Sequence, residues 1–262
     1  MKISARPWIV AVLAVFLAGC SDSPEENILI LTSKAERGDA GAQFQLGVKL
    51  HDLDNSTATE EERKSAFKWY KKAADQGHTE AEFSTGVCYY YRLGVESDPV
   101  AAARYLRKAA DKNHTWAQVK LAECYESGYG VPKDEKQAFE WLIRAANRDN
   151  LSAIYKVSTM YSRGEGVVSD NAKATIWLRK GVALGSAECL YDLGLSYEYG
   201  RGVSKDEVEA YACYNVAAIT IEQARHNLEA IEKRLPVEAR LRGQQRSREL
   251  QKEIEATKQA GK

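Results

Sequence analysis

The sequence is poor in the residue types that build disulfide scaffolds and metal centres. Its 262 residues include five cysteines, four histidines, five prolines and two methionines. Five cysteines are too few for a disulfide-dense scaffold. Neither a paired Cys-x-x-Cys nor a His-x-x-x-His spacing is present to hold a metal ion. We therefore expect a protein without a metal or other cofactor, and without a nucleophilic or metal-dependent catalytic centre.

A net charge of either sign is also missing. The chain has 37 Lys and Arg residues against 37 Asp and Glu residues, whereas a protein dedicated to nucleic acid needs a basic excess to displace counterions from phosphates. The balance is uneven along the chain, because residues 20–221 carry 25 basic against 30 acidic residues and residues 222–262 carry 10 against 7. We expect no nucleic-acid partner, and least of all for the acidic part.

The sequence has no apolar run long enough to span a bilayer as a helix. Its start has two basic residues, Lys2 and Arg6, and then an apolar stretch from Trp8 to Phe16. This is the order of a secretory signal, and the stretch is too short to cross about 30 Å of hydrocarbon. The simplest interpretation is a cleaved signal.

The four residues that follow, Leu17 to Cys20, resemble the lipobox of bacterial lipoproteins. The resemblance implies a signal peptide over residues 1–19, a lipid on Cys20 and a tether over residues 20–27. Because Ser21 and not an aspartate follows the cysteine, it also implies a periplasmic protein held at the inner leaflet of the outer membrane. The alternative is an ordinary secretory signal with a chance cysteine.

What the remainder of the chain has is a 36-residue period. Five columns of similar side chains keep this spacing through the middle of the sequence, which unrelated loops would not do. The columns are Tyr89, Tyr125, Tyr161 and Tyr197; Gly94, Gly130, Gly166 and Gly202; Asp98, Asp134, Asp170 and Asp206; Ala66, Ala102, Ala138, Ala174 and Ala210; and Trp69, Tyr105, Trp141 and Trp177, ending at Cys213.

Each period predicts two helices. Ala81, Thr85 and Tyr89 lie on one face of the first helix at a spacing of four residues. The recurrent aspartate begins the second helix, because its carboxylate can accept from the free N–H groups of the first turn. A Gly-x-Gly element between the helices supplies the positive φ of a tight hairpin.

The combined pattern, Ala-x-x-x-Leu-Gly-x-x-Tyr, Gly-x-Gly-Val-x-x-Asp and Ala-x-x-Trp, resembles the Sel1-like repeat, a relative of the tetratricopeptide unit. The resemblance implies an all-α fold: a right-handed α-solenoid of about five helix-turn-helix repeats over residues 28–218. The first repeat is irregular, since residues 51–62 replace its Gly-x-Gly turn. Residues 219–262 predict two more helices, which we interpret as a C-terminal cap of the solenoid. A partner-binding arm is the alternative for this tail.

Three sequence fragments invite catalytic interpretations. The Gly-x-Gly turns lack the preceding strand and the following Lys-Ser/Thr of a phosphate loop. Ser65-x-x-Lys68 and Ser169-Asp-Asn171 match two of the three signatures of β-lactam-interacting serine enzymes, but the Lys-Thr-Gly element is absent. Some cysteine-rich relatives of the repeat family have been described as penicillin-binding. We expect no enzyme, and a β-lactam-interacting enzyme is the least favoured alternative.

Two of the cysteines stand in positions where a bond is conceivable. Cys189 falls early in one predicted helix and Cys213 late in the antiparallel next one, so they lie nearly opposite each other across the hairpin. An oxidising periplasm permits a bridge, and two small reduced core residues are the equal alternative. Cys88 and Cys124 project from parallel helices about 8–10 Å apart, which is too far for a bond.

A second stripe on each first helix predicts the partner-binding surface. In related solenoids this stripe lines the concave groove, and here its residues differ from repeat to repeat, unlike the core columns. Mixed charge with tyrosine at both ends suits a protein-binding site. A solvated face that binds nothing is the alternative. The stripe residues are Ser84, Val87, Tyr91, Lys120, Glu123, Ser127, Lys156, Thr159, Arg163, Asp192, Leu195 and Tyr199.

These observations predict a lipid-anchored periplasmic scaffold that binds a protein partner through its groove. The resemblance also implies two more specific roles. One is an immunity protein that neutralises a secreted antibacterial effector, for example a type VI lipase. The other is an adaptor in assembly of the cell envelope. The partner is then an effector or a component of an envelope complex.

Overall fold

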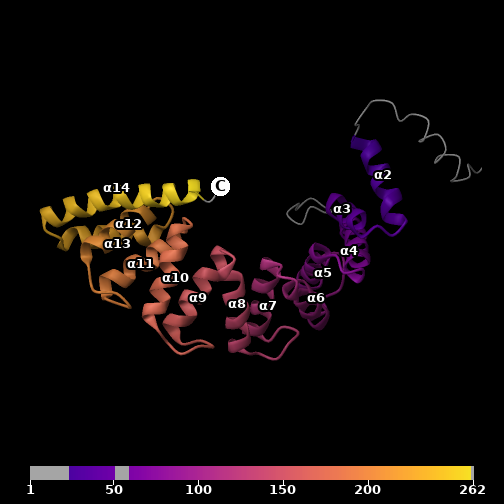
Figure 1. Ribbon diagram of the computed structural model, residues 1–262, viewed down its shortest axis with the longest axis horizontal. Coiled ribbons are helices and arrows are strands. Elements are labelled where there is room, and N and C mark those ends of the chain that lie inside the picture. Colours follow the sequence, from indigo (N-terminus) through magenta and orange to yellow (C-terminus); the bar gives the residue numbers. More distant parts are fainter. Residues whose placement is uncertain (1–23, 51–58, 261–262) are drawn as a thin grey trace, which may run out of the picture.

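The computed structural model describes residues 24–50 and 59–260, and all regular secondary structure in these two stretches is helical. The helices follow one another along an open crescent (Figure 1). They are α2 (Pro24–Glu36), α3 (Ala40–Leu50), α4 (Glu60–Asp75), α5 (Thr79–Tyr91), α6 (Pro99–Asp111), α7 (Thr115–Ser127), α8 (Glu135–Asn147), α9 (Leu151–Arg163), α10 (Asn171–Ala183), α11 (Ala187–Tyr199), α12 (Glu207–Ala217), α13 (Glu222–Arg234) and α14 (Val237–Ala260).

Five helix pairs run from α3–α4 to α11–α12, and each second helix packs both on its own first helix and on the first helix of the next pair. This confirms the predicted α-solenoid. The irregular first pair differs in one detail from the sequence-based interpretation: α4 already begins at Glu60, where Thr59 and Glu62 form a capping box.

The recurrent aspartates cap the second helices as predicted. The carboxylate of Asp134, for example, accepts from the backbone N–H of Gln137 at 3.0 Å. The first helices have a capping column that the sequence analysis did not identify, with His78, His114, Asn150 and Ser186 accepting from the first turn. In the two histidines the acceptor is Nδ1, so the caps require the tautomer with its proton on Nε2.

The two glycines of each Gly-x-Gly turn have different roles. The first, as in Gly128, ends the first helix in the left-handed region at φ 75°. The second also lies against the start of the preceding second helix. A Cβ at Gly130 would stand 1.8 Å from the carbonyl oxygen of Pro99 in α6. Gly94, Gly166 and Gly202 meet α4, α8 and α10 in the same way, so this contact sets the spacing of neighbouring repeats.

The core is built from small residues that let helices approach closely. Buried alanines, valines and leucines form one cluster that continues from α6 to α14. Glycines allow the closest contacts: a Cβ at Gly181 of α10 would stand 2.3 Å from the Sγ of Cys189 in α11. Burial of such apolar surface supplies most of the stabilisation of a repeat array.

Helices α13 and α14 close the C-terminal end. Helix α14 packs on α12 and reaches α10, with Ala239, Gly243, Ser247 and Leu250 buried along one face. Polar contacts fix this face, since Arg246 Nε donates to Glu209 of α12 at 2.9 Å. The tail is therefore a helical cap, as predicted, with its polar side outward.

Several sequence predictions fall outside the described residues. The signal peptide over residues 1–19, the lipidated Cys20 and the first half of the tether belong to residues 1–23, whereas residues 24–27 already form the start of α2. Residues 51–58 of the irregular first repeat are also outside the described part. Within the two described stretches, no helix combines the length and the apolar character that a membrane crossing requires.

Candidate functional site

The predicted stripe residues lie where successive first helices meet the surface. Tyr91 and Tyr199 at its two ends are 51% and 58% exposed. The residues between them are half-buried or exposed, with one exception: Ser84 is 4% exposed, and it lies below the surface that a partner can reach. The prediction of Ser84 as a contact residue is therefore corrected.

Polar contacts connect the stripes of neighbouring repeats. Lys120 Nζ of α7 donates to the hydroxyl of Tyr91 in α5 at 2.9 Å and to Glu123 at 2.7 Å. Glu123 in turn lies 3.8 Å from Lys156 of α9. Residues that are about 30 positions apart in the sequence thus form one continuous polar surface. Burial acts to lower the pKa of Lys120, but its hydrogen bonds to Glu123 and Tyr91 outweigh this effect and the pKa is raised.

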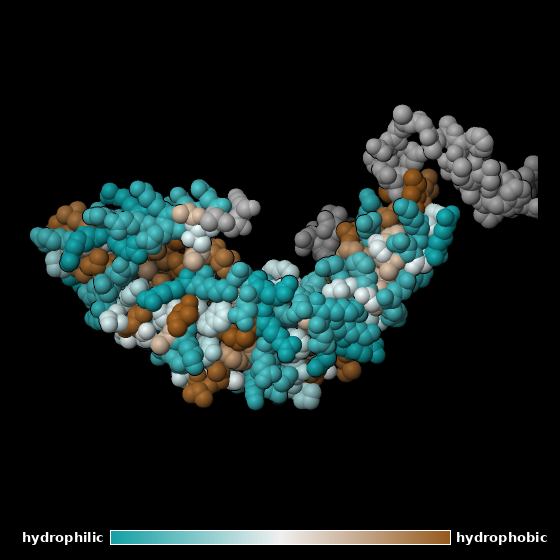
Figure 2. Space-filling view, in the orientation of Figure 1, coloured by the Kyte–Doolittle hydropathy of each residue, from teal (hydrophilic) through white to brown (hydrophobic). Residues whose placement is uncertain are grey.

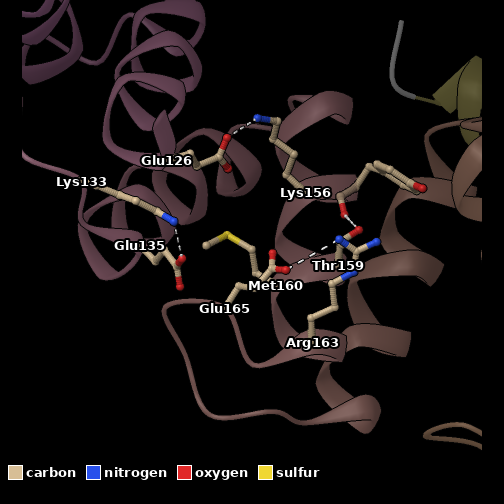
Figure 3. Close-up of a pocket in the computed structure, with 9 residues that line it drawn as sticks. Glu126, Lys133, Glu135, Lys156, Thr159, Met160, Arg163 and Glu165 are labelled. Atoms are coloured by element: carbon tan, nitrogen blue, oxygen red, sulfur yellow. Dashed lines mark hydrogen bonds and ion pairs between the residues drawn. The ribbon is translucent and has the colours of Figure 1, made fainter. Parts of the chain in front are cut away.

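Two hollows adjoin on this surface, and together they form what we call the groove. The first, of about 500 Å³, lies between α7 and α9 (Figure 3) and is lined by Glu126, Lys133, Glu135, Tyr155, Lys156, Thr159, Met160, Arg163 and Glu165. The second, of about 280 Å³, shares Tyr155, Thr159 and Arg163 with the first and extends to α11 and the turn that follows it. Five stripe residues therefore line the groove: Lys156, Thr159, Arg163, Asp192 and Leu195.

The side chains in the groove hold one another in place. Lys156 Nζ donates to Glu126 at 2.8 Å, and Arg163 lies 3.6 Å from Glu165 (Figure 3). Tyr199 connects to the second hollow through Arg201, whose guanidinium lies 5.1 Å from the ring centre of Tyr199. Charged groups, hydroxyls and exposed aromatic rings on a fixed framework provide recognition of a protein surface.

A model of the Sel1 repeat matches five segments that cover most of the chain: residues 40–78, 79–114, 117–150, 151–186 and 187–219. The chain belongs to the Sel1 repeat family. The five segments coincide with the five helix pairs from α3 to α12. Sel1 repeats generally bind other proteins.

Solved structures of Sel1 proteins have the same architecture. A Sel1 repeat protein from Oxalobacter formigenes is 27% identical, with a TM-score of 0.72 over 95% of this chain and 99% of that one. The protein c5321, described as a protective antigen of uropathogenic Escherichia coli strains with an SLR fold, is 25% identical, with a TM-score of 0.76 over 96% of this chain. This chain spans 54% of the length of c5321. Among curated proteins, none matches this chain.

Within this Sel1 protein, Tyr155 and Glu126 are groove residues that the sequence analysis missed. Tyr155 directly precedes the stripe residue Lys156 in α9, and Glu126 directly precedes Ser127 in α7. Both reach the groove because long side chains lean along the helix. The sequence signal for Tyr155 is that it is an aromatic residue on α9 outside the repeat column to which Tyr161 belongs.

Asp192 lines the second hollow of the groove and is half-buried. Burial raises the pKa of this carboxyl group, and the hydrogen bond with Tyr155 and the nearby charge of Arg163 only partly oppose the rise. Such a carboxyl group binds its proton more tightly in the folded than in the unfolded chain. The free energy of unfolding therefore falls as the pH rises from the pKa of the unfolded chain through that of the folded chain.

Asp192→Asn is therefore expected to increase the free energy of unfolding at pH 7, with the gain disappearing below about pH 4, where the unfolded carboxyl is also protonated. Urea unfolding of both proteins between pH 3 and pH 8 measures this. Asp111→Asn, which changes an exposed carboxylate of α6, is the control and should show no such pH dependence. An equal gain at every pH would contradict the assignment to ionisation of Asp192.

The four cysteines of the described residues, Cys88, Cys124, Cys189 and Cys213, are free and buried. Cys189 packs on Gly181 of α10, whereas the Cβ of Cys213 lies next to Gly194 of α11, so the two thiols face different neighbours. Burial raises the pKa of Cys88, Cys124 and Cys213 to about 12, and that of Cys189 to about 11. A bridge between Cys189 and Cys213 stays a prediction.

The folded Sel1 array is expected to react very slowly with thiol reagents at pH 8, because the thiolate is the reactive form. Titration of the Cys20→Ser chain with a chromogenic disulfide measures this in buffer and in denaturant. Unfolding should release four thiols when all are reduced and two when Cys189 and Cys213 are bridged. Rapid reaction of the folded protein would contradict the burial of these cysteines.

The catalytic fragments considered in the sequence do not converge. Ser65 and Lys68 lie on α4 of the first repeat, and Ser169 precedes α10 of the fourth, where its hydroxyl donates to the backbone of Ser162 at 3.2 Å. No group of three or more metal-ligating side chains occurs in the part of the chain that the structure describes.

Proposed function

We propose that this Sel1 protein is a non-enzymatic adaptor that binds a protein partner through the groove. One observation carries the proposal: the core, cap and turn columns repeat every 36 residues, whereas the groove positions differ in each repeat. At one equivalent position of four successive first helices, for example, the residues are Val87, Glu123, Thr159 and Leu195. Side chains that only maintain the array have no reason to vary in this way, and a specific partner requires such variation.

Photo-crosslinking in cells tests the proposal. A crosslinking residue at Thr159 in the groove should capture a defined protein, and one at Ile176, which is 63% exposed on α10, should not. With that partner purified, Arg163→Ala and Tyr199→Ala should each weaken binding by about tenfold or more, because arginine and tyrosine dominate protein interfaces.

Arg148→Ala and Ile176→Ala are the matched controls, since both residues are exposed and neither lines the groove. Equal effects of groove and control variants on binding would overturn the proposed site. The captured protein also distinguishes the specific roles: an antibacterial effector supports an immunity protein, and an envelope component supports an assembly adaptor.

We propose in addition that Cys20 carries the lipid that anchors the mature chain, at the periplasmic side of the outer membrane. The support is the order of basic residues, apolar stretch and lipobox-like Leu17-Ala18-Gly19-Cys20. The mature protein should then have the mass of residues 20–262 plus several acyl chains, which together hold a protein stably on a membrane. Cys20→Ala should release it into the soluble fraction; continued membrane attachment would refute the anchor.

A further inference from the structure

The two ends of the solenoid are different. The C-terminal end is covered by α13 and α14, whereas at the other end the described residues begin with α2, which has the place of a second helix and packs on α3. Ala35 and Gly38 stand 39 residues before Ala74 and Gly77, so Ile30 takes the position of Trp69. Trp69 is covered by α3, whereas Ile30 is 51% exposed. The N-terminal end thus presents a face that an internal repeat would bury.

This face is apolar at its centre, and charged side chains of both signs border it. Ile28, Leu29 and Ile30 of α2 and Val48 of α3 are 43%, 65%, 51% and 42% exposed, and Figure 2 shows hydrophobic side chains on α2. A hollow of about 510 Å³ between the two helices is lined by apolar Ile30 and Leu31, and by two lysines against one aspartate, Lys34, Lys49 and Asp39. The Asp39 carboxylate accepts from the backbone N–H of Ala42 at the start of α3. Lys34, Arg37 and Lys49 are exposed, and the structure gives them no ion pair with another described residue. We call Ile28, Leu29, Ile30, Val48, Lys34 and Lys49 the end face.

The length of chain before α2 indicates what covers the end face. Helix α2 begins at Pro24, four residues after Cys20, and four residues reach at most roughly 14 Å even when fully extended. A lipid on Cys20 would hold α2 within this distance of the headgroups. At that depth aliphatic side chains enter the interface, and lysines and arginines pair with anionic lipids.

We propose that the end face docks on the anionic lipid surface to which Cys20 is anchored. This inference rests on the anchor proposed above. The crescent then stands on the bilayer by α2, and the C-terminal cap lies at its opposite end (Figure 1). The groove, built by α7 to α11, is then in the aqueous space. A soluble partner reaches the groove without competition from the membrane.

A polarity-sensitive fluorophore on the lipidated protein tests the docking. Leu29→Cys supplies one reactive thiol, because Cys20 is capped by its lipid and the other cysteines are buried. Reconstituted in phosphatidylcholine vesicles with phosphatidylglycerol, the label should emit at shorter wavelength and be quenched by lipids that carry a quencher. A label on Val168→Cys, at a site 85% exposed in the turn before α10, should behave as in water. Identical behaviour of the two labels would overturn the docking.

Three further measurements test the anionic contact, self-association of the protein and the lipid anchor separately. Lys34→Glu combined with Lys49→Glu should reduce quenching of the residue-29 label in anionic vesicles and leave Val168→Cys unchanged; no reduction would refute the anionic contact. The label at residue 29 is also measured on the Cys20→Ser chain in the absence of vesicles. A blue shift of its emission that grows with protein concentration would show that a second copy covers the end face, and would also overturn the docking. The mass of the mature protein tests the anchor alone, so a missing lipid is recognised independently of the fluorescence.

Discussion

Gly130→Ala should lower the free energy of unfolding by about 3 kcal/mol, one of the two largest effects expected in this molecule. The backbone at Gly130 has φ 72°, a conformation that costs an L-residue about 1–2 kcal/mol. The added Cβ would also stand 1.8 Å from the carbonyl oxygen of Pro99. Backbone cannot rotate away as a flexible side chain can, so α6 and the turn must separate, and overpacking of this kind costs about 1–3 kcal/mol more.

Gly128→Ala is the matched control, two residues away in the same turn. Its φ of 75° imposes a similar conformational cost, but its Cβ meets nothing nearer than 3.5 Å. We expect a loss of only about 1 kcal/mol. Urea unfolding followed by circular dichroism compares the two variants with the parent protein. Equal losses would show that the close approach of α6 and the turn contributes nothing to stability.

The second large effect is expected at the junction of the last repeat and its cap. Glu198 of α11 is 8% exposed, accepts from the hydroxyl of Tyr214 in α12 and pairs with Arg234 of α13. Glu198→Ala would leave a buried hydroxyl and a guanidinium without their charged partner. Hydrogen bonds to charged groups each contribute about 1.5–3 kcal/mol, and the half-exposed Arg234 recovers part of its loss from water, so we expect about 3 kcal/mol in total.

Because repeat arrays lose cooperativity between units, this loss should be local. Hydrogen exchange should accelerate in α12 and α13 of the Glu198→Ala variant, and remain unchanged in α5 to α8. Glu207→Ala is the control: Glu207 also lies near Arg234, at 3.5 Å, but its side chain is 31% exposed. Uniform acceleration along the whole chain would refute the assignment of this pair to the cap junction.

The repeat pattern was sufficient to predict the fold. Five units within one chain identify the positions that cannot vary, so the aspartate caps and the hairpin turns followed from spacing alone. The physical role of the second glycine did not, because its contact is with Pro99 or an equivalent residue in the preceding repeat, about 30 positions away. In the second repeat, Arg92 takes the left-handed position that glycine holds elsewhere, and no spacing rule predicts this exception.

The groove was harder to predict than the fold, and the cause is the variation that also makes it a candidate site. Its residues change from repeat to repeat, so periodicity identifies the stripe but not the depth of each side chain within it. Ser84 is buried, whereas the longer side chains of Lys120 and Lys156 at the same repeat position are half-buried. Tyr155 and Glu126 enter from neighbouring positions. The exposure of Ile30 was not foreseen either, because the repeat pattern alone does not say what packs on the first described helix.

The contact between each second glycine and the preceding helix has a consequence for how such proteins change in length. At Gly94, Gly130, Gly166 and Gly202 the atoms nearest to an added Cβ all belong to the repeat directly before. Duplication of one 36-residue unit would therefore create a junction of the kind already present. It would lengthen the groove by one repeat without any compensating change elsewhere. Recombination within the gene can in this way enlarge the binding surface in fixed increments, while the end face and the cap keep their separate roles.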